Sequence, residues 1–292
     1  MLESVDIASV IHSDVQLGPF DDNETTMPSP NHWDSLHEGR LAAMIEVAQA
    51  AGRHTLKHFR SDSLVVDAKS DDSPVTVADR EAEQLTRQML ADRFPNDTLQ
   101  GEEFEEQTGS SSYRWIVDPI DGTKSFVCGV PLYSTLLALE CDGSPLGGVI
   151  FIPALDEIIV AANEQGCWHR SGEGEWSRAA VSKKSDIKQA VFVTSQVDAF
   201  DERGAVDAYK RLEKEAWITR SWGDGYGYLL VATARADIMI DPVCHAWDVA
   251  AILPIIVEAG GRFTDWRGTA TTRGGDGVGT NGHLHEAVLK LL

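Results

Sequence analysis

The spacing of apolar residues predicts helices at the start of the folded part of the chain and strands after them. Ser35 and Glu38 have the spacing of a capping box and precede an apolar stripe of helical period, which predicts a helix reaching about Arg60. A short strand is expected at 64–66, and Thr76 and Asp79 are expected to open a second helix. Apolar runs separated by turn residues then predict an antiparallel meander at 133–139, 148–152 and 158–162, and another strand is expected to start at 167–170.

The pattern changes near residues 182–186, after which strands and helices alternate. Strands are expected at 190–195, 217–219, 237–240, 262–266 and 277–281. Helices are expected at 204–214, 226–235, 247–259 and from 283 onward. Such alternation is typical of an α/β unit. We therefore expect a disordered acidic tail over 1–34, an α+β subdomain with an antiparallel sheet over 35–184, and an α/β subdomain over 185–292, with a cleft between the subdomains.

The net charge of the chain limits the kinds of partner that it can bind. With 25 basic and 46 acidic residues among 292, the formal net charge is −21, which repels nucleic acid and anionic membranes. No apolar run approaches the length of a membrane span. A phosphate ester would also be repelled, unless a divalent cation reversed the local sign of the charge.

The four cysteines form no C-x-x-C pair, so they fit buried thiols in a reducing compartment better than disulfides or a zinc site. The N-terminus lacks a basic and then apolar leader, and a cytoplasmic location is expected. His54 and His58 are four residues apart, as metal ligands can be, but no H-E-x-x-H glutamate accompanies them. Because they also lie on the polar face of the first helix, we expect solvated histidines.

The candidate site residues are most concentrated in the stretch 115–126. Its sequence is Trp-Ile-Val-Asp-Pro-Ile-Asp-Gly-Thr-Lys-Ser-Phe. An apolar strand is expected to end at Asp118, because Pro119 cannot donate to a sheet ladder. Asp121 stands three residues after Asp118, so two converging carboxylates would favour a cation between them. Gly122 permits a tight turn, and Thr123 is a candidate cap for a short helix whose free N–H groups would face an anion. In isolation, two aspartates at this spacing would more simply be explained as solvated side chains in a turn.

Four motifs in order resemble the inositol monophosphatase family of Mg²⁺-dependent, lithium-sensitive phosphatases, over about residues 40–292. They are Gly101-Glu102-Glu103, the run from Asp118 to Thr123, Trp247-Asp248-Val249-Ala250-Ala251 and Glu258-Ala259-Gly260-Gly261. The resemblance implies a layered αβαβα sandwich, hydrolysis of a small-molecule phosphate ester and a homodimer. It also places Lys69 and Asp79 at the rim of the metal site.

By this resemblance, two to three Mg²⁺ ions are held by oxygen ligands alone. Glu102, Asp118 and the Ile120 carbonyl hold one ion, Asp118, Asp121 and Asp248 hold a second, and a third shares Glu102. Glu102 and Thr123 would hold the attacking water, one ion would lower its pKa, and another would stabilise the leaving alkoxide. The backbone N–H groups of Gly122 and Thr123 would hold the phosphate.

A non-enzymatic Ca²⁺-binding protein is the alternative from another class. An EF-hand loop fails, because the positions that need acids around Gly122 hold Val117 and Cys128. Acidic residues clustered beside N–H groups that can bind a phosphate are more typical of an enzyme active site.

Specificity is expected from the second subdomain. The run from Trp222 through Gly223 and Asp224 to Tyr228, with Asp241 at a strand end, resembles the histidinol-phosphate phosphatase branch of the family, although Gly225 stands where that branch is expected to carry Cys. Acids with aromatic walls suit the ammonium and imidazole of histidinol phosphate; packing under a glycine turn would equally explain Trp222. Inositol monophosphate is the alternative substrate. Fructose bisphosphate and adenosine bisphosphate fit less well, because no basic cluster for a second phosphate is evident.

Overall fold

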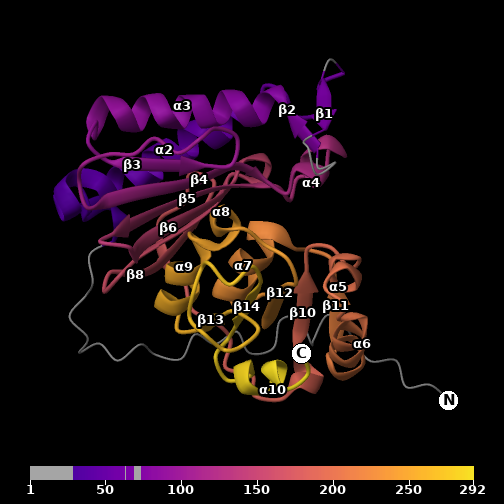
Figure 1. Cartoon of the computed structure of the whole chain (residues 1–292). Coiled ribbons are helices and arrows are strands. Elements are labelled where there is room, and N and C mark those ends of the chain that lie inside the picture. The colour runs from indigo at the N-terminus through magenta and orange to yellow at the C-terminus, as the bar shows by residue number, and fades with distance from the viewer. Residues whose placement is uncertain (1–28, 63, 69–73) are drawn as a thin grey trace.

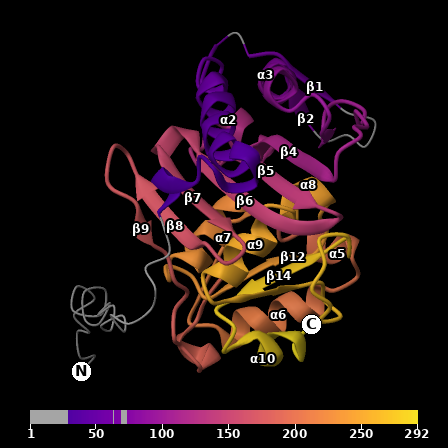
Figure 2. The same ribbon diagram turned by 90° about the vertical axis from the view of Figure 1, so that its left-hand side faces the viewer.

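Five layers of helices and strands alternate through the structure, a computed structural model that describes residues 29–62, 64–68 and 74–292. Helices α2 and α3 cover the outer face of a first sheet, and α7, α8 and α9 fill the space between this sheet and a second one (Figure 1). Helices α5, α6 and α10 cover the outer face of the second sheet (Figures 1 and 2). The αβαβα sandwich that the resemblance implied is therefore confirmed.

The first sheet has seven strands in the order β3-β4-β5-β6-β7-β8-β9, in which only β3 and β4 run parallel. Its strands are Thr98–Gly101, Tyr113–Asp121, Ser134–Cys141, Ser144–Ile152, Glu157–Ala162, Gly166–Ser171 and Ser177–Arg178. Both faces of this sheet are buried, and successive residues of β5 point to opposite faces. Leu136 and Ala138 pack toward the middle helices, whereas Leu137 and Leu139 pack under α2. The predicted meander is this sheet; β3 and β9 were not predicted.

The second sheet has the order β11-β10-β12-β14-β13. Its strands, in chain order, are β10 Val191–Thr194, β11 Ile218–Arg220, β12 Ile238–Asp241, β13 Arg262–Thr264 and β14 Gly277–Thr280. Because β10 and β12 are parallel neighbours, their carboxyl ends meet at one edge. The chain passes from the first sheet to the second between β9 and β10; the division at residues 184 and 185 stays a prediction.

The predicted helices are present in the predicted order but differ at their ends, and α5 was not predicted. The helices are α2 Arg40–Thr55, α3 Val77–Arg93, α4 Thr123–Val127, α5 Ala199–Glu202, α6 Val206–Glu215, α7 Asp224–Ala232, α8 Ala246–Val249, α9 Ile252–Glu258 and α10 His285–Leu289. A two-stranded ribbon, β1 Val66–Ala68 and β2 Pro74–Thr76, precedes α3. At the start of α3, the capping box of Thr76 and Asp79 is confirmed.

The predicted capping box of Ser35 and Glu38 is wrong. Ser35 makes no capping hydrogen bond, and a 3₁₀ turn, Leu36–Gly39, precedes α2. The chain enters α2 through Gly39, whose φ of 82° lies in the left-handed region that glycine tolerates. Helix α2 then ends at Thr55 instead of near Arg60, and its apolar stripe continues through turns.

Two elements near prolines differ from the predicted ones. Strand β4 continues through Pro119 to Asp121, because the register shifts between Asp118 and Asp121 and Pro119 falls in that irregularity. The helix predicted over 247–259 is broken between α8 and α9, since Pro254 has no N–H to donate to the carbonyl of Ala250.

The expected tail, 1–34, lies outside the described residues up to residue 28. Residues 29–34 belong to the fold, because Trp33 is fully buried against Leu41 and Met44. The four cysteines, all in the described part, are free thiols, two of them buried. None of the helices in residues 29–62, 64–68 and 74–292 is long and apolar enough to cross a membrane.

His285 is expected to make the fold acid-sensitive. Its buried ring lies between the Thr264 and Thr280 hydroxyls at 2.9 and 3.0 Å, and burial, followed by the charge of Arg262, lowers its pKa from 6.5 to about 4. The unfolded chain therefore binds a proton as the pH falls through about 6.5, whereas the folded protein stays neutral there until about 4. The contribution of His285 to the free energy of unfolding is therefore complete above about pH 6.5, and it is lost as the pH falls from about 6.5 to about 4.

Urea unfolding of the wild type and His285→Gln measures this contribution. Between about pH 7.5 and about pH 4.5, the wild type should lose about 2–3 kcal/mol relative to the variant. A constant difference between the two proteins would contradict the assignment.

Candidate active site

Three carboxylates meet where the first sheet faces the middle helices. Asp118 and Asp121 come from the end of β4, and Asp248 comes from α8, which packs against β4 (Figure 1). One oxygen of each lies within 4.8 Å of the others, and Asp118 and Asp121 are buried. We call these three residues the acid cluster. They are 130 residues apart at most in the sequence, and the fold brings them into the range of one cation.

Glu102 and the Ile120 carbonyl lie beside Asp118. Glu102 follows the last residue of β3, the parallel neighbour of β4, and its carboxyl contacts that of Asp118. The backbone N–H of Ile120 donates to Asp118 Oδ1 at 3.1 Å, which fixes the Asp118 side chain, while the Ile120 carbonyl accepts from Thr123 Oγ1 at 3.0 Å. A carbonyl oxygen has two lone pairs, so it retains one for a further partner.

Asp121 is held by residues that the sequence analysis missed. Ser134 Oγ and the backbone N–H of Gly225 both donate to Asp121 Oδ2 at 2.5 Å. A Cβ on Gly225 would come within 3.0 Å of Asp121 Oδ2 and of Ser134 Oγ. The close approach of α7 to β4 therefore requires glycine at 225 here, where the resemblance led us to expect Cys. Only the folded chain reveals the contact, since Asp121 and Gly225 are 104 residues apart.

Asp248 has the local role that its position predicts. Its Oδ2 accepts the backbone N–H of His245 at 2.6 Å at the start of α8, where an acid is favourable. This bond occupies one oxygen, and the remaining lone pairs are available to the acid cluster.

Thr123 does not cap α4 as expected. The capping position is Gly122, with φ 83°, and Thr123 is the first helical residue. Its hydroxyl instead donates to the Ile120 carbonyl and lies 3.5 Å from Asp79 Oδ1. Asp79 Oδ2 accepts from the Thr76 backbone and hydroxyl at 2.8 and 2.6 Å, so Asp79 both caps α3 and borders the site. Lys69 lies outside the described residues.

A second pair of acids comes from β12 and α7. Asp241 ends β12, and Asp224 begins α7. Ser195, which follows β10, links them: its hydroxyl donates to Asp241 Oδ1 and accepts the Asp224 backbone N–H at 2.9 Å. The Asp224 carboxylate lies close to Gly122, because a Cβ there would come within 3.0 Å of Asp224 Oδ2. Ser195 was not predicted, because no motif marks it.

Trp222 and Gly223 border this pair in different ways. The Trp222 side chain is not core, since the residue is 42% exposed. Gly223 is needed for packing, because a Cβ there would come within 3.0 Å of the backbone of Thr194 and Ser195. The glycine lets α7 begin directly against the end of β10.

The electrostatics of the site favour a bound cation. Burial, followed by the charges of Glu102, Asp121 and Asp248, raises the pKa of Asp118 well above its usual range. Burial and then the charges of Asp224 and Asp248 do the same to the pKa of Asp121. Burial is also the main cause that raises the pKa of Asp248 and of Asp241 to about 7. Hard oxygen donors that repel one another in this way fit a divalent cation of the Mg²⁺ or Ca²⁺ type.

Comparison with known proteins identifies the family. The model of the inositol monophosphatase family matches residues 37–292, so the chain belongs to that family. It is a phosphoric monoester hydrolase.

Curated relatives include histidinol-phosphatases and inositol-1-monophosphatases. The histidinol-phosphatase of Chlorobaculum parvum is 40% identical over 82% of this chain and 90% of its own length, and that of Mycobacterium tuberculosis is 38% identical over 86% and 97%. The inositol-1-monophosphatase of Rhizobium meliloti is 32% identical over 86% and 95%. Among solved structures, the IMPase of Thermotoga maritima has a TM-score of 0.77 at 30% identity and covers 86% of this chain and 96% of its own.

Proposed function

We propose that the protein is a Mg²⁺-dependent histidinol-phosphate phosphatase. The observation that carries the proposal is the pairing of two acidic groups across one site. The acid cluster, on β4 and α8, suits a metal ion, and Asp224 on α7 with Asp241 on β12 suits an ammonium group. Inositol monophosphate has no cation for that second pair.

Glu102, Asp118 and the Ile120 carbonyl would hold one Mg²⁺, and Asp118, Asp121 and Asp248 would hold a second, with Glu102 available to a third. Ions held by these residues would supply positive charge to the phosphate oxygens and a lowered pKa to the attacking water. Glu102 and the Thr123 hydroxyl hold that water for attack in line with the leaving oxygen. The Ile120 carbonyl accepts the Thr123 hydroxyl proton and orients this side chain, and Asp79 lies beside it at 3.5 Å. The N–H groups of Gly122 and Thr123 would bind the phosphate.

Asp241 and Asp224 recognise the part of the substrate beyond the phosphate. Ser195 aligns the two carboxylates, and the exposed Trp222 offers an aromatic wall to the imidazole or ammonium group. Gly223 contributes by letting this segment approach β10. The homodimer and the cytoplasmic location stay predictions.

A panel of phosphate esters tests the substrate. In Mg²⁺, kcat/KM for histidinol phosphate should exceed that for inositol monophosphate, fructose 1,6-bisphosphate and glycerol phosphate by at least about tenfold, which corresponds to about 1.4 kcal/mol. A preference for inositol monophosphate would favour the alternative, which the relative from Rhizobium meliloti supports.

A further inference from the structure

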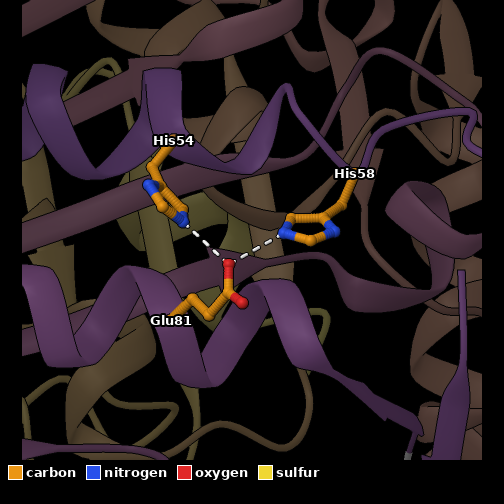
Figure 3. Close-up of side chains that lie close together, drawn as sticks. All are labelled: His54, His58 and Glu81. Atoms are coloured by element: carbon orange, nitrogen blue, oxygen red, sulfur yellow. Dashed lines mark hydrogen bonds and ion pairs between the residues drawn. The ribbon is translucent and has the colours of Figure 1, made fainter.

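Two histidines and a glutamate meet on the outer helical layer, outside the acid cluster. His54 lies near the end of α2, His58 lies in the turn after it, and Glu81 lies on α3 (Figure 3). Glu81 Oε2 lies 2.8 Å from Nε2 of His54 and 2.8 Å from Nε2 of His58. In the described part of the chain, these residues and the acid cluster are the two groups of three side chains whose ligand atoms lie within 4.8 Å of one another.

The backbone explains why the two rings point the same way. Helix α2 ends at Thr55, but the N–H of Lys57 still donates to the His54 carbonyl at 3.1 Å, and that of His58 donates to the Thr55 carbonyl at 3.0 Å. These bonds span three residues, as in a 3₁₀ turn, and the Phe59 N–H donates across four residues to the Thr55 carbonyl at 3.1 Å, so the chain keeps winding past the end of α2 and His58 stays near His54. The sequence predicted solvated histidines because no glutamate is near them in the chain. The fold supplies one from α3, and the histidine side chains are only 21% and 25% exposed.

We propose that His54, His58 and Glu81 form a second metal site, which takes Zn²⁺ or a related first-row transition ion. Two imidazole nitrogens and one carboxylate oxygen are a ligand set that Zn²⁺ uses with water in the fourth position. The acid cluster offers only oxygen, which suits Mg²⁺. The two sites therefore differ in metal preference as well as in place.

The two distances between Glu81 and the histidine rings need a small adjustment to admit an ion. Zinc bonds of about 2.0–2.1 Å in a tetrahedron place the ligand atoms about 3.3 Å apart. Glu81 Oε2 must therefore move back from the rings by about half an ångström. The Glu81 side chain is 44% exposed, so it is free to do so.

Lys57 competes with the metal. Its Nζ lies 3.2 Å from His54 Nδ1, and an ammonium can only donate there. That bond requires the proton of the neutral His54 ring to be on Nε2, the atom that must bind the metal. Metal binding therefore requires the exposed Lys57 side chain to leave, and its removal should strengthen binding.

An ion at this site would tie the end of α2 to α3. Glu81 is two residues beyond Asp79, which caps α3 and lies 3.5 Å from the Thr123 hydroxyl. A bound ion should therefore stabilise the folded state without replacing any active-site residue. At a free concentration of a hundred times its Kd, an ion that binds only the folded state lowers the unfolding equilibrium constant about 100-fold.

Calorimetric titration of the full chain with Zn²⁺ in saturating Mg²⁺, which keeps the acid cluster filled, tests the site. The wild type should bind one Zn²⁺ that His54→Ala, His58→Ala and Glu81→Gln each weaken by at least about tenfold. Co²⁺ in its place should give visible absorption bands that the same variants lose. Zn²⁺ should also raise the midpoint of thermal unfolding of the wild type but not of the double variant His54→Ala/His58→Ala.

Two further variants separate this site from non-specific binding. His169 forms a comparable pair with Glu157 at 2.8 Å but has no second histidine, so His169→Ala should leave Zn²⁺ binding unchanged. Lys57→Met should tighten binding, whereas Arg53→Met, which removes a neighbouring charge, should tighten it less. Equal Zn²⁺ affinity and stoichiometry in the wild type and the double histidine variant would overturn the proposal, as would the absence of any Zn²⁺ binding in Mg²⁺.

Discussion

Replacement of Asp118 by Asn is expected to lower kcat/KM by at least about 10³-fold, which corresponds to about 4 kcal/mol of activation free energy. Asp118 is the carboxylate proposed to bridge two ions, and it lies between Glu102 and the other members of the acid cluster. The amide keeps one oxygen to accept the Ile120 N–H, so the variant loses the charge and retains the local geometry. Steady-state phosphate release at saturating Mg²⁺ measures the loss.

The same variant should be more stable than the wild type when metal is absent. Burial and three neighbouring acids raise the pKa of Asp118, so its ionised form destabilises the metal-free fold above the unfolded pKa, and protonation relieves this as the pH falls. Asn removes that cost at neutral pH. Thermal unfolding in excess chelator should therefore show a higher midpoint for Asp118→Asn than for the wild type.

A buried aspartate with basic partners provides the matched control. Asp97 accepts from Arg40 at 2.8 and 2.9 Å and from Trp115 at 3.0 Å, so Asp97→Asn should lose stability and retain turnover. Wild-type turnover that continues undiminished in excess chelator would contradict the metal-dependent mechanism. A variant at Asp118 that unfolds in chelator would contradict the electrostatic account.

The fold was predictable where local pattern and packing agree. The strands of the meander were found because alternating residues of β5 and β6 fill two cores, and α3 was found because Thr76 and Asp79 carry its cap in the sequence. The errors occurred where a distant contact decides the local structure. Strand β4 runs on through Pro119 because β5 still pairs with it at Asp121, and no pattern within the stretch indicates this pairing.

In the site, too, the residues of local motifs were predictable from the sequence and the distant contacts were not. Asp118, Asp121 and Asp248, which come from two of the motifs, lie close together, but the groups that orient them come from elsewhere in the chain. Ser134 and Gly225 hold Asp121, and Ser195 joins Asp224 to Asp241. A serine or glycine has no sequence signal of its own for such a role. Glu81 is a similar case, since it lies 23 residues from His58 along the chain.

The substrate assignment predicts a selective effect at Asp241. If histidinol phosphate is the substrate, Asp241→Asn should lower its kcat/KM by about 30-fold or more, because an unpaired buried cation costs about 2–5 kcal/mol. Asn still offers an oxygen to the Ser195 hydroxyl, the partner of Asp241 Oδ1. Glycerol phosphate, which has no cation, should be hydrolysed almost as well by the variant as by the wild type.

The pH dependence provides a second measurement on the same residue. Burial, with the charge of Asp224 adding to it, raises the pKa of Asp241 to about 7, so the fraction that carries a negative charge rises with pH through that value. The KM for histidinol phosphate should fall over this range in the wild type and not in Asp241→Asn. Equal losses on both esters would instead indicate damage at the acid cluster, since the charge of Asp241 also acts on Asp248. If the wild type prefers inositol monophosphate from the outset, the second acidic pair does not recognise an ammonium group and the substrate assignment is wrong.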